Sequence, residues 1–394
     1  MIISAIATIL VWIIQSWGWL QPGELKTYDR WMSWRGSLPA DERILVITID
    51  DDDIKYQRNQ GLTMNMQGSL ADSTLEKLLS KLQPYHPKAI ASDIIHDFPF
   101  TPELANTVQK TDYFLAICRV KVPQSKLVSI APPPQLPQQQ VGFSNWAIDN
   151  DGAIRRQVLG MSPDGVCQSG LSLSLRLALK YLDNVSASFN NQGLLQINGS
   201  VFPKLNISSG GYQLPEAQGY QVLLNYRRSL PRTIPLREIL NTTDQSLTKL
   251  VQDKIILIGV IGHNHDLHYT PYSRGQQAQR LPGVIIHTQM TSQIISTVLG
   301  EQKLLWWVPN EIELLWIALW SMVGSTIILI WRSLTQIAIA TWAALTILFA
   351  CCWILFLDGG WIMAIAPALG LLISAAMGKA RAERIAIFAR RYKF

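Results

Sequence analysis

Three long apolar segments follow one another near the C-terminus of this 394-residue chain, and they limit what it can fold into more than any other feature. The segments are residues 311–331, 335–357 and 361–378. Apart from residue 311, they carry a single formal charge, on Glu313. The hydrocarbon core of a bilayer is about 30 Å thick, so a helix needs roughly 20 apolar residues to cross it. Because polar or glycine residues at 332–334 and 358–360 can turn the chain outside hydrocarbon, the sequence predicts three consecutive transmembrane helices.

The residues after the last apolar segment are strongly basic and predict its orientation. Residues 379–394 contain six lysine or arginine side chains and one acid, Glu383. Most of the chain's net charge of +6 therefore lies in this tail, whereas a nucleic-acid-binding protein needs basic residues spread over a folded surface. Because basic segments next to transmembrane helices stay in the cytoplasm, we expect a cytoplasmic tail and no nucleic-acid partner.

A fourth apolar segment, residues 1–20, lies at the N-terminus. No lysine or arginine precedes it, and no small-residue cleavage pattern precedes Gln21, so an uncleaved anchor is favoured over a cleaved signal peptide. Four crossings of the lipid bilayer would place both termini in the cytoplasm and residues 21–303 outside. The sequence thus predicts a multi-pass protein of a bacterial inner membrane, with one large extracytoplasmic (periplasmic) domain.

Residues 21–303 are numerous enough to build a hydrophobic core of their own. Four short, continuous apolar runs within them are rich in β-branched residues, as is typical of strands buried on both faces. These runs are residues 43–49, 89–95, 113–120 and 254–260. Segments with helical spacing separate the first three runs, and such alternation predicts a parallel, right-handed α/β sheet. Turn sequences such as Asn198-Gly199 predict β-hairpins inserted before the fourth run.

The four cysteines leave the redox state open. Cys351 and Cys352 lie inside an apolar segment, while Cys118 and Cys167 lie in the exported part. An extracytoplasmic compartment permits a disulfide between Cys118 and Cys167, and two separate buried thiols fit the sequence equally well.

Acidic residues at strand ends are the first candidates for ligand binding. Asp50 and Asp93 each close a predicted parallel strand, and open α/β sheets bind ligands at the carboxyl ends of their strands. Two carboxylates at this edge could hold a cation or a polar ligand. The alternative is that they cap the following helices or accept hydrogen bonds from turn amides.

A histidine-rich loop and the segment after it supply further candidates. Imidazoles beside a carboxylate suit a transition metal, although the spacing matches no standard zinc signature, and polar side chains that bond to one another are the alternative. The weak metal candidates are His263, His265 and His268. Thr270 and Tyr272 could contact a ligand; alternatively, Pro271 fixes a turn and Tyr272 packs against the domain.

Sequence patterns typical of catalysis or cofactor binding are missing. The chain contains no P-loop, no glycine-rich dinucleotide turn and no Ser-His-Asp order with an elbow motif, so we expect no enzymatic activity and no cofactor. The acidic turn at 149–152 lacks the bidentate glutamate of a calcium loop. We interpret Arg155 and Arg156, which follow this turn, as the solvated face of a hairpin.

Several short motifs are informative because of the order in which they occur. They are Tyr28-Asp29, Arg35-Gly36, Ile49-Asp50, Ala89-Ile90-Ala91-Ser92-Asp93, Gly142-Phe143, Asp149-Asn150-Asp151-Gly152-Ala153-Ile154-Arg155-Arg156, residues 254–259, Asp266, Thr270-Pro271-Tyr272 and Pro282-Gly283-Val284-Ile285-Ile286-His287. The ordered set extends over almost the whole chain and resembles the second class of CHASE domains (CHASE type 2), the cyclase- and histidine-kinase-associated sensory extracellular domains. The resemblance adds Asp266 and His287 to the candidate ligand-binding residues, but it does not name a ligand.

The resemblance implies one transmembrane helix before the sensor domain and three after it, in agreement with the four apolar segments. Members of the family usually continue into a cyclase, a histidine kinase or a Ser/Thr kinase, whereas sixteen residues follow the last apolar segment here. We therefore expect either a cytoplasmic cyclase or kinase that acts in trans, or a shortened form of a longer receptor.

The resulting hypothesis is a non-catalytic membrane sensor that binds an unknown signal outside the cell and passes it through its helices to a cytoplasmic partner. A homodimer would transmit a helix rearrangement most easily, although no sequence feature requires one. The alternative is a structural or scaffold protein of the cell envelope without signalling output. A transporter is disfavoured, because transport usually needs polar or ionisable groups in the membrane, and Glu313 and a few hydroxyls are all that the apolar segments offer.

Overall fold

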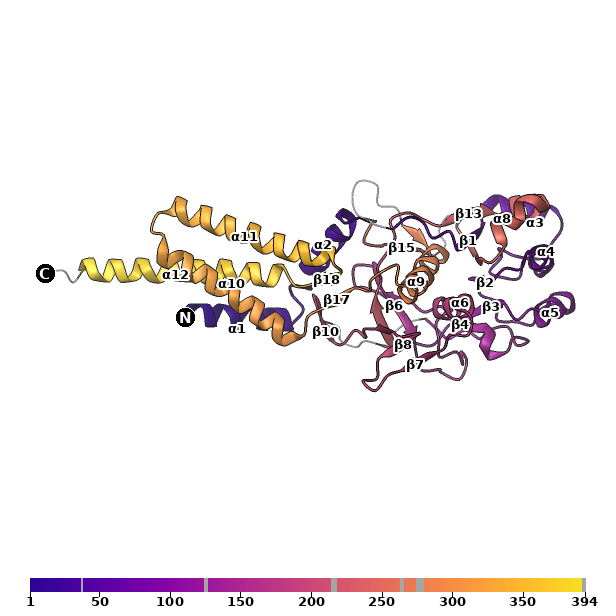
Figure 1. Ribbon diagram of the computed structural model, residues 1–394, viewed down its shortest axis with the longest axis horizontal. Coiled ribbons are helices and arrows are strands. Elements are labelled where there is room, and N and C mark those ends of the chain that lie inside the picture. The colour runs from indigo at the N-terminus through magenta and orange to yellow at the C-terminus, as the bar shows by residue number, and fades with distance from the viewer. Residues whose placement is uncertain (37, 124–126, 214–217, 263–265, 274–279, 392–394) are drawn as a thin grey trace. The chain divides into compact units, whose positions relative to one another are not determined.

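The computed structural model describes the chain in two compact units (Figure 1). The described residues are 1–36, 38–123, 127–213, 218–262, 266–273 and 280–391. An α/β unit comprises residues 36–204 and 218–304, and a helical unit comprises residues 1–35, 205–217 and 305–394.

The centre of the α/β unit is a six-stranded sheet in which all neighbouring strands run parallel. From one edge to the other, the strands are β13 (Arg232–Pro235), β1 (Ile44–Ile49), β14 (Ile255–Val260), β2 (Ala89–Ser92), β3 (Phe114–Cys118) and β4 (Val141–Phe143). The prediction of a parallel α/β sheet is thereby confirmed. β14, the last of these six strands in the sequence, lies between β1 and β2, so β1 and β2 do not pair directly.

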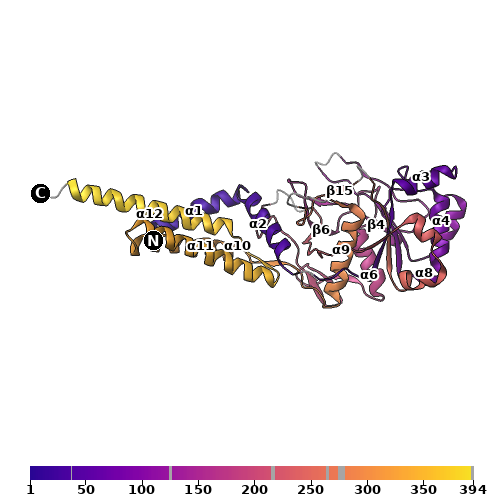
Figure 2. The same ribbon diagram turned by 90° about the horizontal axis from the view of Figure 1, so that it is seen from above.

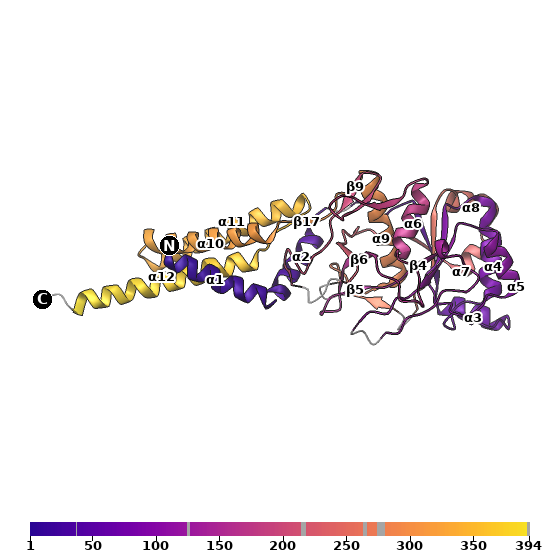
Figure 3. The ribbon, with the colours of Figure 1, turned by 90° about the horizontal axis from the view of Figure 1, so that it is seen from below.

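Helices cover both faces of this sheet, which explains why its strands are continuous apolar runs. One face carries α3 (Asp51–Asn59), α4 (Asp72–Leu82), α5 (Pro102–Gln109), α7 (Leu236–Asn241) and α8 (Asp244–Val251), and the other carries α6 (Leu173–Leu182) and α9 (Gly283–Val298) (Figure 2, with α5 and α7 labelled in Figure 3). Each face of the sheet has its own hydrophobic core, and successive strand residues point into opposite cores. Ile47 packs in the core beneath α4, and Val46 packs in the core beneath α6 and α9.

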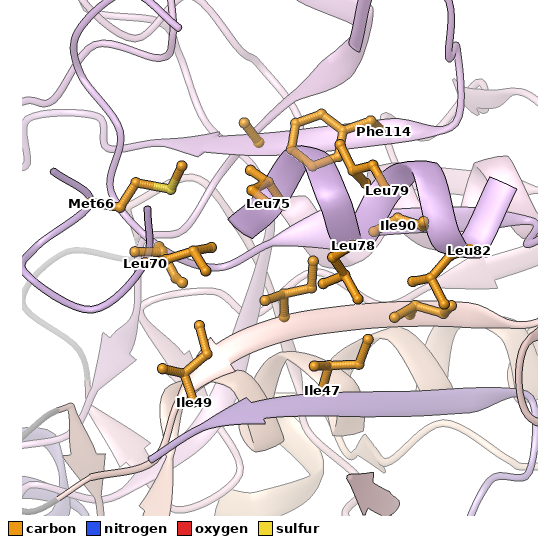
Figure 4. Packing of buried hydrophobic residues seen from close by; sticks show 14 of the residues in the cluster. Ile47, Ile49, Met66, Leu70, Leu75, Leu78, Leu79, Leu82, Ile90 and Phe114 are labelled. Atoms are coloured by element: carbon orange, nitrogen blue, oxygen red, sulfur yellow. The ribbon is translucent and has the colours of Figure 1, made fainter. Parts of the chain in front are cut away.

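The core beneath α4 illustrates this packing. Apolar residues recur on α4 at helical spacing, so its leucines form one stripe along the helix. Figure 4 shows Leu75, Leu78, Leu79 and Leu82 facing the sheet residues Ile47, Ile49, Ile90 and Phe114. Each of the leucines is at most 1% exposed.

Two small antiparallel sheets confirm the predicted hairpins. The first contains β5 (Ala147–Ile148), β6 (Ile154–Gly160) and β12 (Tyr220–Leu223), and the second contains β7 (Ala187–Phe189), β8 (Leu195–Ile197) and β9 (Ser200–Phe202). A disulfide between Cys118, the last residue of β3, and Cys167 answers the question that the sequence left open.

The interpretation of Arg155 and Arg156 as a solvated face is wrong. The Arg155 side chain is 0% exposed, and its guanidinium lies 2.6 Å from Asp149 and 2.7 Å from Asp151. Arg156 lies 2.5 Å from the other oxygen of Asp149 and donates to Gln221. A buried charge is tolerated only when it is paired, so the acidic turn supplies counter-ions for the two arginines rather than ligands for calcium.

The helical unit contains the apolar segments predicted from the sequence. Its main elements are α1 (Ile2–Ser16), α2 (Gln21–Trp34), β17 (Trp306–Trp307), α10 (Asn310–Ile330), α11 (Leu334–Leu357), β18 (Gly360–Trp361) and α12 (Ile365–Arg391). Helices α1, α10 and α12 pack against one another, and α11 contacts α10 and α12 (Figure 3). β17 pairs with β18, so the start of α10 and the approach to α12 lie at one end of this unit.

The expectation of four transmembrane helices is not supported. By length and composition, α10 and α11 can cross a membrane, and α1 with α2 can form a third span only if a pair bent by 82° counts as one. Gly18, with φ of +75°, follows the end of α1, which therefore contains 15 residues. Trp361 enters β18, and the apolar part of α12, Ile365–Ala380, is shorter than the predicted span requires.

Glu24 of α2 fixes the start of α12 within the helical unit. Its carboxylate is 0% exposed and accepts hydrogen bonds from the backbone amides of Ala364, Ile365 and Ala366 at 2.8–3.0 Å. The first amides of a helix have no partner inside it, and the helix dipole favours an anion there, so this carboxylate serves as the cap. Gly211 makes room for it, because a Cβ at that position would lie 2.5 Å from the Cβ of Glu24.

Candidate ligand-binding site

The α/β unit contains a cavity of about 750 Å³ at the carboxyl ends of β2, β3 and β14. This is the edge at which open α/β sheets bind ligands. The side chains of Asp93, Arg119 and Val260, which follow or end these three strands, all line it. Trp146, Asp266, His268 and Val284 line it as well, so the hairpin strand β5, the loop after β14 and the start of α9 complete the walls.

Asp93 is the most unusual residue of the cavity. It follows β2 directly, and its side chain is only 8% exposed. No residue in the described part of the chain donates a hydrogen bond to its carboxyl group, and Nε2 of His287 lies 3.6 Å from Oδ1. Burial raises the pKa of Asp93 well above its usual value, and the negative charge of Asp266 raises it further.

His287 lies behind Asp93 on α9 and is 2% exposed. Its Nδ1 is 3.2 Å from the hydroxyl of Ser174 on α6, while its Nε2 has no partner among the residues described. Burial lowers the pKa of His287 to about 4 because the imidazolium form loses its hydration. The ring is therefore neutral near pH 7, and its contact with Asp93 is not an ion pair.

The indole ring of Trp146 contacts two histidine rings. Its centroid is 4.2 Å from that of His287 and 5.1 Å from that of His268. The histidines belong to different elements, since His287 lies in α9 and His268 in β15 (Leu267–His268). Their contacts fix one aromatic face in the cavity wall.

Asp266 is held at the mouth of the cavity beside His268. Its Oδ1 is 2.5 Å from Nε2 of His268, and its side chain is 53% exposed. Gly283, the first residue of α9, permits this position, because a Cβ there would lie 1.9 Å from Oδ2 of Asp266. The Pro282-Gly283 sequence, read above as part of a motif, thus has a steric role next to the cavity.

The remaining walls are mostly apolar, with a few polar groups. Ile95, Ile117, Val120 and Val260 provide aliphatic surface. Arg119 is the only lysine or arginine among the described lining residues, and its Nε donates to the carbonyl of Val128 at 2.9 Å.

Sequence reasoning did not find Trp146 or Arg119. Arg119 could have been found, because it lies at the end of the third predicted strand as Asp50 and Asp93 lie at the ends of the first two. Trp146 gave no such signal, since its place depends on how the hairpin packs against α9.

The structure brings Asp93, Asp266 and His287 together, but it places the other predicted ligand-binding residues elsewhere. Asp50 caps α3: it accepts from the amide of Asp53 at 2.8 Å and pairs with Arg237 at 2.6 Å, as the alternative interpretation proposed. β14 lies between β1 and β2 and so separates Asp50 from Asp93 across the sheet.

Thr270 and Tyr272 also make contacts within the domain. Thr270 is 1% exposed, its hydroxyl lies 3.2 Å from that of Ser273, and it accepts from the amide of Tyr272 at 3.3 Å. The ring of Tyr272 packs edge to face on Tyr226, 6.4 Å between centroids. Ligand contact by these two residues and by Asp50 stays a prediction.

The structure describes one of the three metal candidates, His268. His263 and His265 lie outside the described residues, and His268 contacts Asp266. Among the residues that are described, no group of three or more histidine, cysteine or acidic side chains is arranged to hold a metal ion.

Comparison with known proteins places the chain in one family. A family model described as the CHASE2 domain matches residues 6–326. Searches of curated proteins and of solved structures returned no match. The matched range includes the whole of the α/β unit and therefore every residue of the cavity.

Proposed function

Because the chain belongs to the CHASE2 family of sensory extracellular domains, we propose that its α/β unit is an extracytoplasmic sensor whose ligand occupies the cavity at Asp93. The protein has apolar helices that place it in a lipid bilayer, and the ligand would bias how these helices pack. The proposal assigns the chain a binding role without catalysis.

The observation that carries the proposal is the buried, unpartnered carboxyl group of Asp93 in the cavity wall. Burying a polar group without a hydrogen bond costs about 1–3 kcal/mol in proteins. Buried polar groups without a hydrogen-bond partner occur at functional sites, where a ligand supplies the missing partner. The cavity also has the size of a metabolite site, since such sites measure roughly 300–1,000 Å³.

We propose that the α/β unit faces the periplasm of a bacterial inner membrane and that the tail faces the cytoplasm. The disulfide between Cys118 and Cys167 suits an oxidising compartment outside the cytoplasm. Trp306, Trp307 and Trp361 lie at the end of the helical unit where β17 pairs with β18, as in an interfacial aromatic belt. Arg332, between α10 and α11, lies at the other end.

In this topology α12 crosses the membrane as well, although its apolar part is short. The helix has 27 residues and is thus about 40 Å long, which exceeds the thickness of about 30 Å of the hydrocarbon core. α1 would be the anchor before the sensor, and α2 an interfacial helix.

Signal output requires that the ligand bind two states of the protein with different affinity. A coupling free energy of about 1–3 kcal/mol gives a useful response. We propose that α12 and the basic tail pass the change to a cytoplasmic cyclase or kinase that acts in trans, and that the chain works as a homodimer. The supporting feature is that Glu24 ties α2 to the first amides of α12.

The topology is tested by adding protease to spheroplasts that express the chain with an epitope tag after Phe394. Cleavage within residues 36–304 with the tag intact supports the proposal. Loss of the tag with an intact α/β unit would refute it.

The output is tested by isolating the full chain from its native membranes together with bound proteins, and by comparing it with a chain that ends at Gly378. Recovery of a cyclase or kinase only with the full chain supports a sensor that acts through its tail. The same set of proteins with and without the tail would instead favour the scaffold function.

A further inference from the structure

We propose that the cavity selects a small molecule that carries a protonated amine, to which Asp93 and Asp266 offer acceptor oxygens beside the ring of Trp146; this inference rests on the proposed sensor function. The ligand class follows from three properties of the cavity: its unused acceptors, its aromatic wall and the rest of its lining.

The first property is an excess of acceptors over donors around the carboxyl groups. Neither oxygen of Asp93 receives a hydrogen bond from a residue that the structure describes, and Oδ1 of Asp266 contacts only His268. A carboxylate is purely an acceptor, whereas an ammonium group offers three N–H donors and a positive charge. Burial raises the pKa of Asp93 and so favours its neutral form in the empty cavity. The positive charge of an ammonium group favours the ionised carboxylate, whereas a neutral alcohol does not and an anion opposes it.

The second property is the aromatic wall. The face of an indole attracts a cation that lies within about 6 Å of it, and this attraction grows when water is excluded. Trp146 is held by His268 and His287 at 5.1 and 4.2 Å, so it need not reorganise to receive a ligand. Since His287 is neutral near pH 7, it adds no positive charge that would oppose the amine.

The third property is the remaining lining, which suits a carbon skeleton. Ile95, Ile117 and Val120 offer apolar surface. Arg119 follows β3 just beyond Ile117 and could meet an acid group at the other end of the ligand, so amino-acid-like zwitterions belong to the proposed class.

A metal ion is the competing cation, and the cavity is less suited to it. Calcium takes 6–8 oxygen ligands and zinc usually takes four ligands. In the described part of the chain no set of three acidic, histidine or cysteine side chains converges on one point. An organic ammonium needs fewer acceptors and gains from the tryptophan.

The test is calorimetry and thermal unfolding of the full chain in lipid nanodiscs with matched probes. The probes are butylamine, putrescine and the standard amino acids, compared with butanol, butanediol, butyrate and the chloride salts of calcium and zinc. We expect at least one amine to bind, whereas its alcohol and acid counterparts do not.

Four variants test the assignment of residues. Asp93→Asn keeps the shape of the side chain and should weaken amine binding at least tenfold, which corresponds to about 1.4 kcal/mol. Asp266→Asn should weaken it less, because that side chain is 53% exposed. Trp146→Leu should weaken it through loss of the ring. Asp112→Asn, in an exposed acid that pairs with Lys180 outside the cavity, is the matched control and should leave the affinity unchanged.

The outcomes separate this inference from the proposed function. The inference would be overturned, while the sensor function stands, if a metal, an acid or an alcohol bound and no amine did. It would also be overturned if amines bound equally well to the Asp93→Asn and Asp266→Asn variants. No amine binding up to about 10 mM, a concentration at which even very weak complexes form, would overturn it too. Amine binding without any tail-dependent partner would support the ligand class and refute the sensor function.

Discussion

Replacing Arg155 with methionine should destabilise the α/β unit by about 2–3 kcal/mol. Removing one partner from a buried ion pair typically costs about 3–5 kcal/mol when the other charge stays buried without compensation. The side chain of Arg155 is 0% exposed and that of Asp149, at 2.6 Å, is 1% exposed, but Arg156 still pairs with Asp149 at 2.5 Å after the substitution, so the expected cost lies below that range. For a unit of this size, such a loss lowers the unfolding temperature by about 4–12 °C.

A matched substitution at an exposed ion pair supplies the control. Lys55 lies 3.4 Å from Asp52, and their side chains are 68% and 67% exposed. Exposed pairs contribute about 0–1 kcal/mol, so Lys55→Met should change the unfolding temperature by only a few degrees. Both variants are compared with the unaltered chain by following tryptophan fluorescence during heating in the same detergent.

The comparison also tests how the hairpin supports the cavity. The amide of Ile154 donates to the carbonyl of Tyr269 at 2.8 Å, which connects β6 to the segment after His268. Arg155→Met should therefore also weaken ligand binding below the unfolding temperature. If Arg155→Met destabilises the protein no more than Lys55→Met does, the account of the buried ion cluster is wrong.

Three further predictions concern single groups. Asp93→Asn should stabilise the unliganded protein above pH 4, because folding raises the pKa of Asp93. Such a carboxyl lowers the free energy of unfolding by about 1.4 kcal/mol per pH unit as the pH rises from its unfolded pKa of about 4 to its folded pKa. Unfolding temperatures of the variant and the unaltered chain that depend equally on pH would contradict this. Glu24→Ala should lower the free energy of unfolding by about 1–2 kcal/mol, because it removes the cap of α12. Glu24→Gln keeps one acceptor oxygen, so equal unfolding temperatures of the two variants would exclude a role for the acceptor. Replacing Cys118 and Cys167 by serine should cost about 2–4 kcal/mol, and a non-reduced sample in which maleimide labels either cysteine would disprove the disulfide.

The strands were predictable because burial on both faces leaves a simple signal. Ile44–Ile49 and Ile255–Val260 read as continuous apolar runs since helices cover both sides of the sheet. The position of Asp93 was predictable for a related reason, because the residue after a buried parallel strand lies at the edge where ligands bind. Such local patterns do not depend on how distant segments pack.

Other features depend on distant partners and left no local pattern. Gln221 helps to bury Arg156 but lies 65 positions away, and the disulfide closes a separation of 49 residues. Trp146 becomes a cavity wall only when His268 and His287 pack against it. The ends of α1 and α12 were predicted incorrectly because a turn at Gly18 and the strand at Trp361 interrupt apolar sequence without a change in hydropathy.

The place of β14 in the sheet has a consequence for biosynthesis. β1 and β2 are made early, yet each pairs with Ile255–Val260, which is made about two hundred residues after β1. A nascent chain that ends before Ile255 leaves facing edges of β1 and β2 open, and open edges readily pair with other chains. Folding of the domain therefore awaits late translation, and a truncated product should aggregate rather than persist as a partial domain.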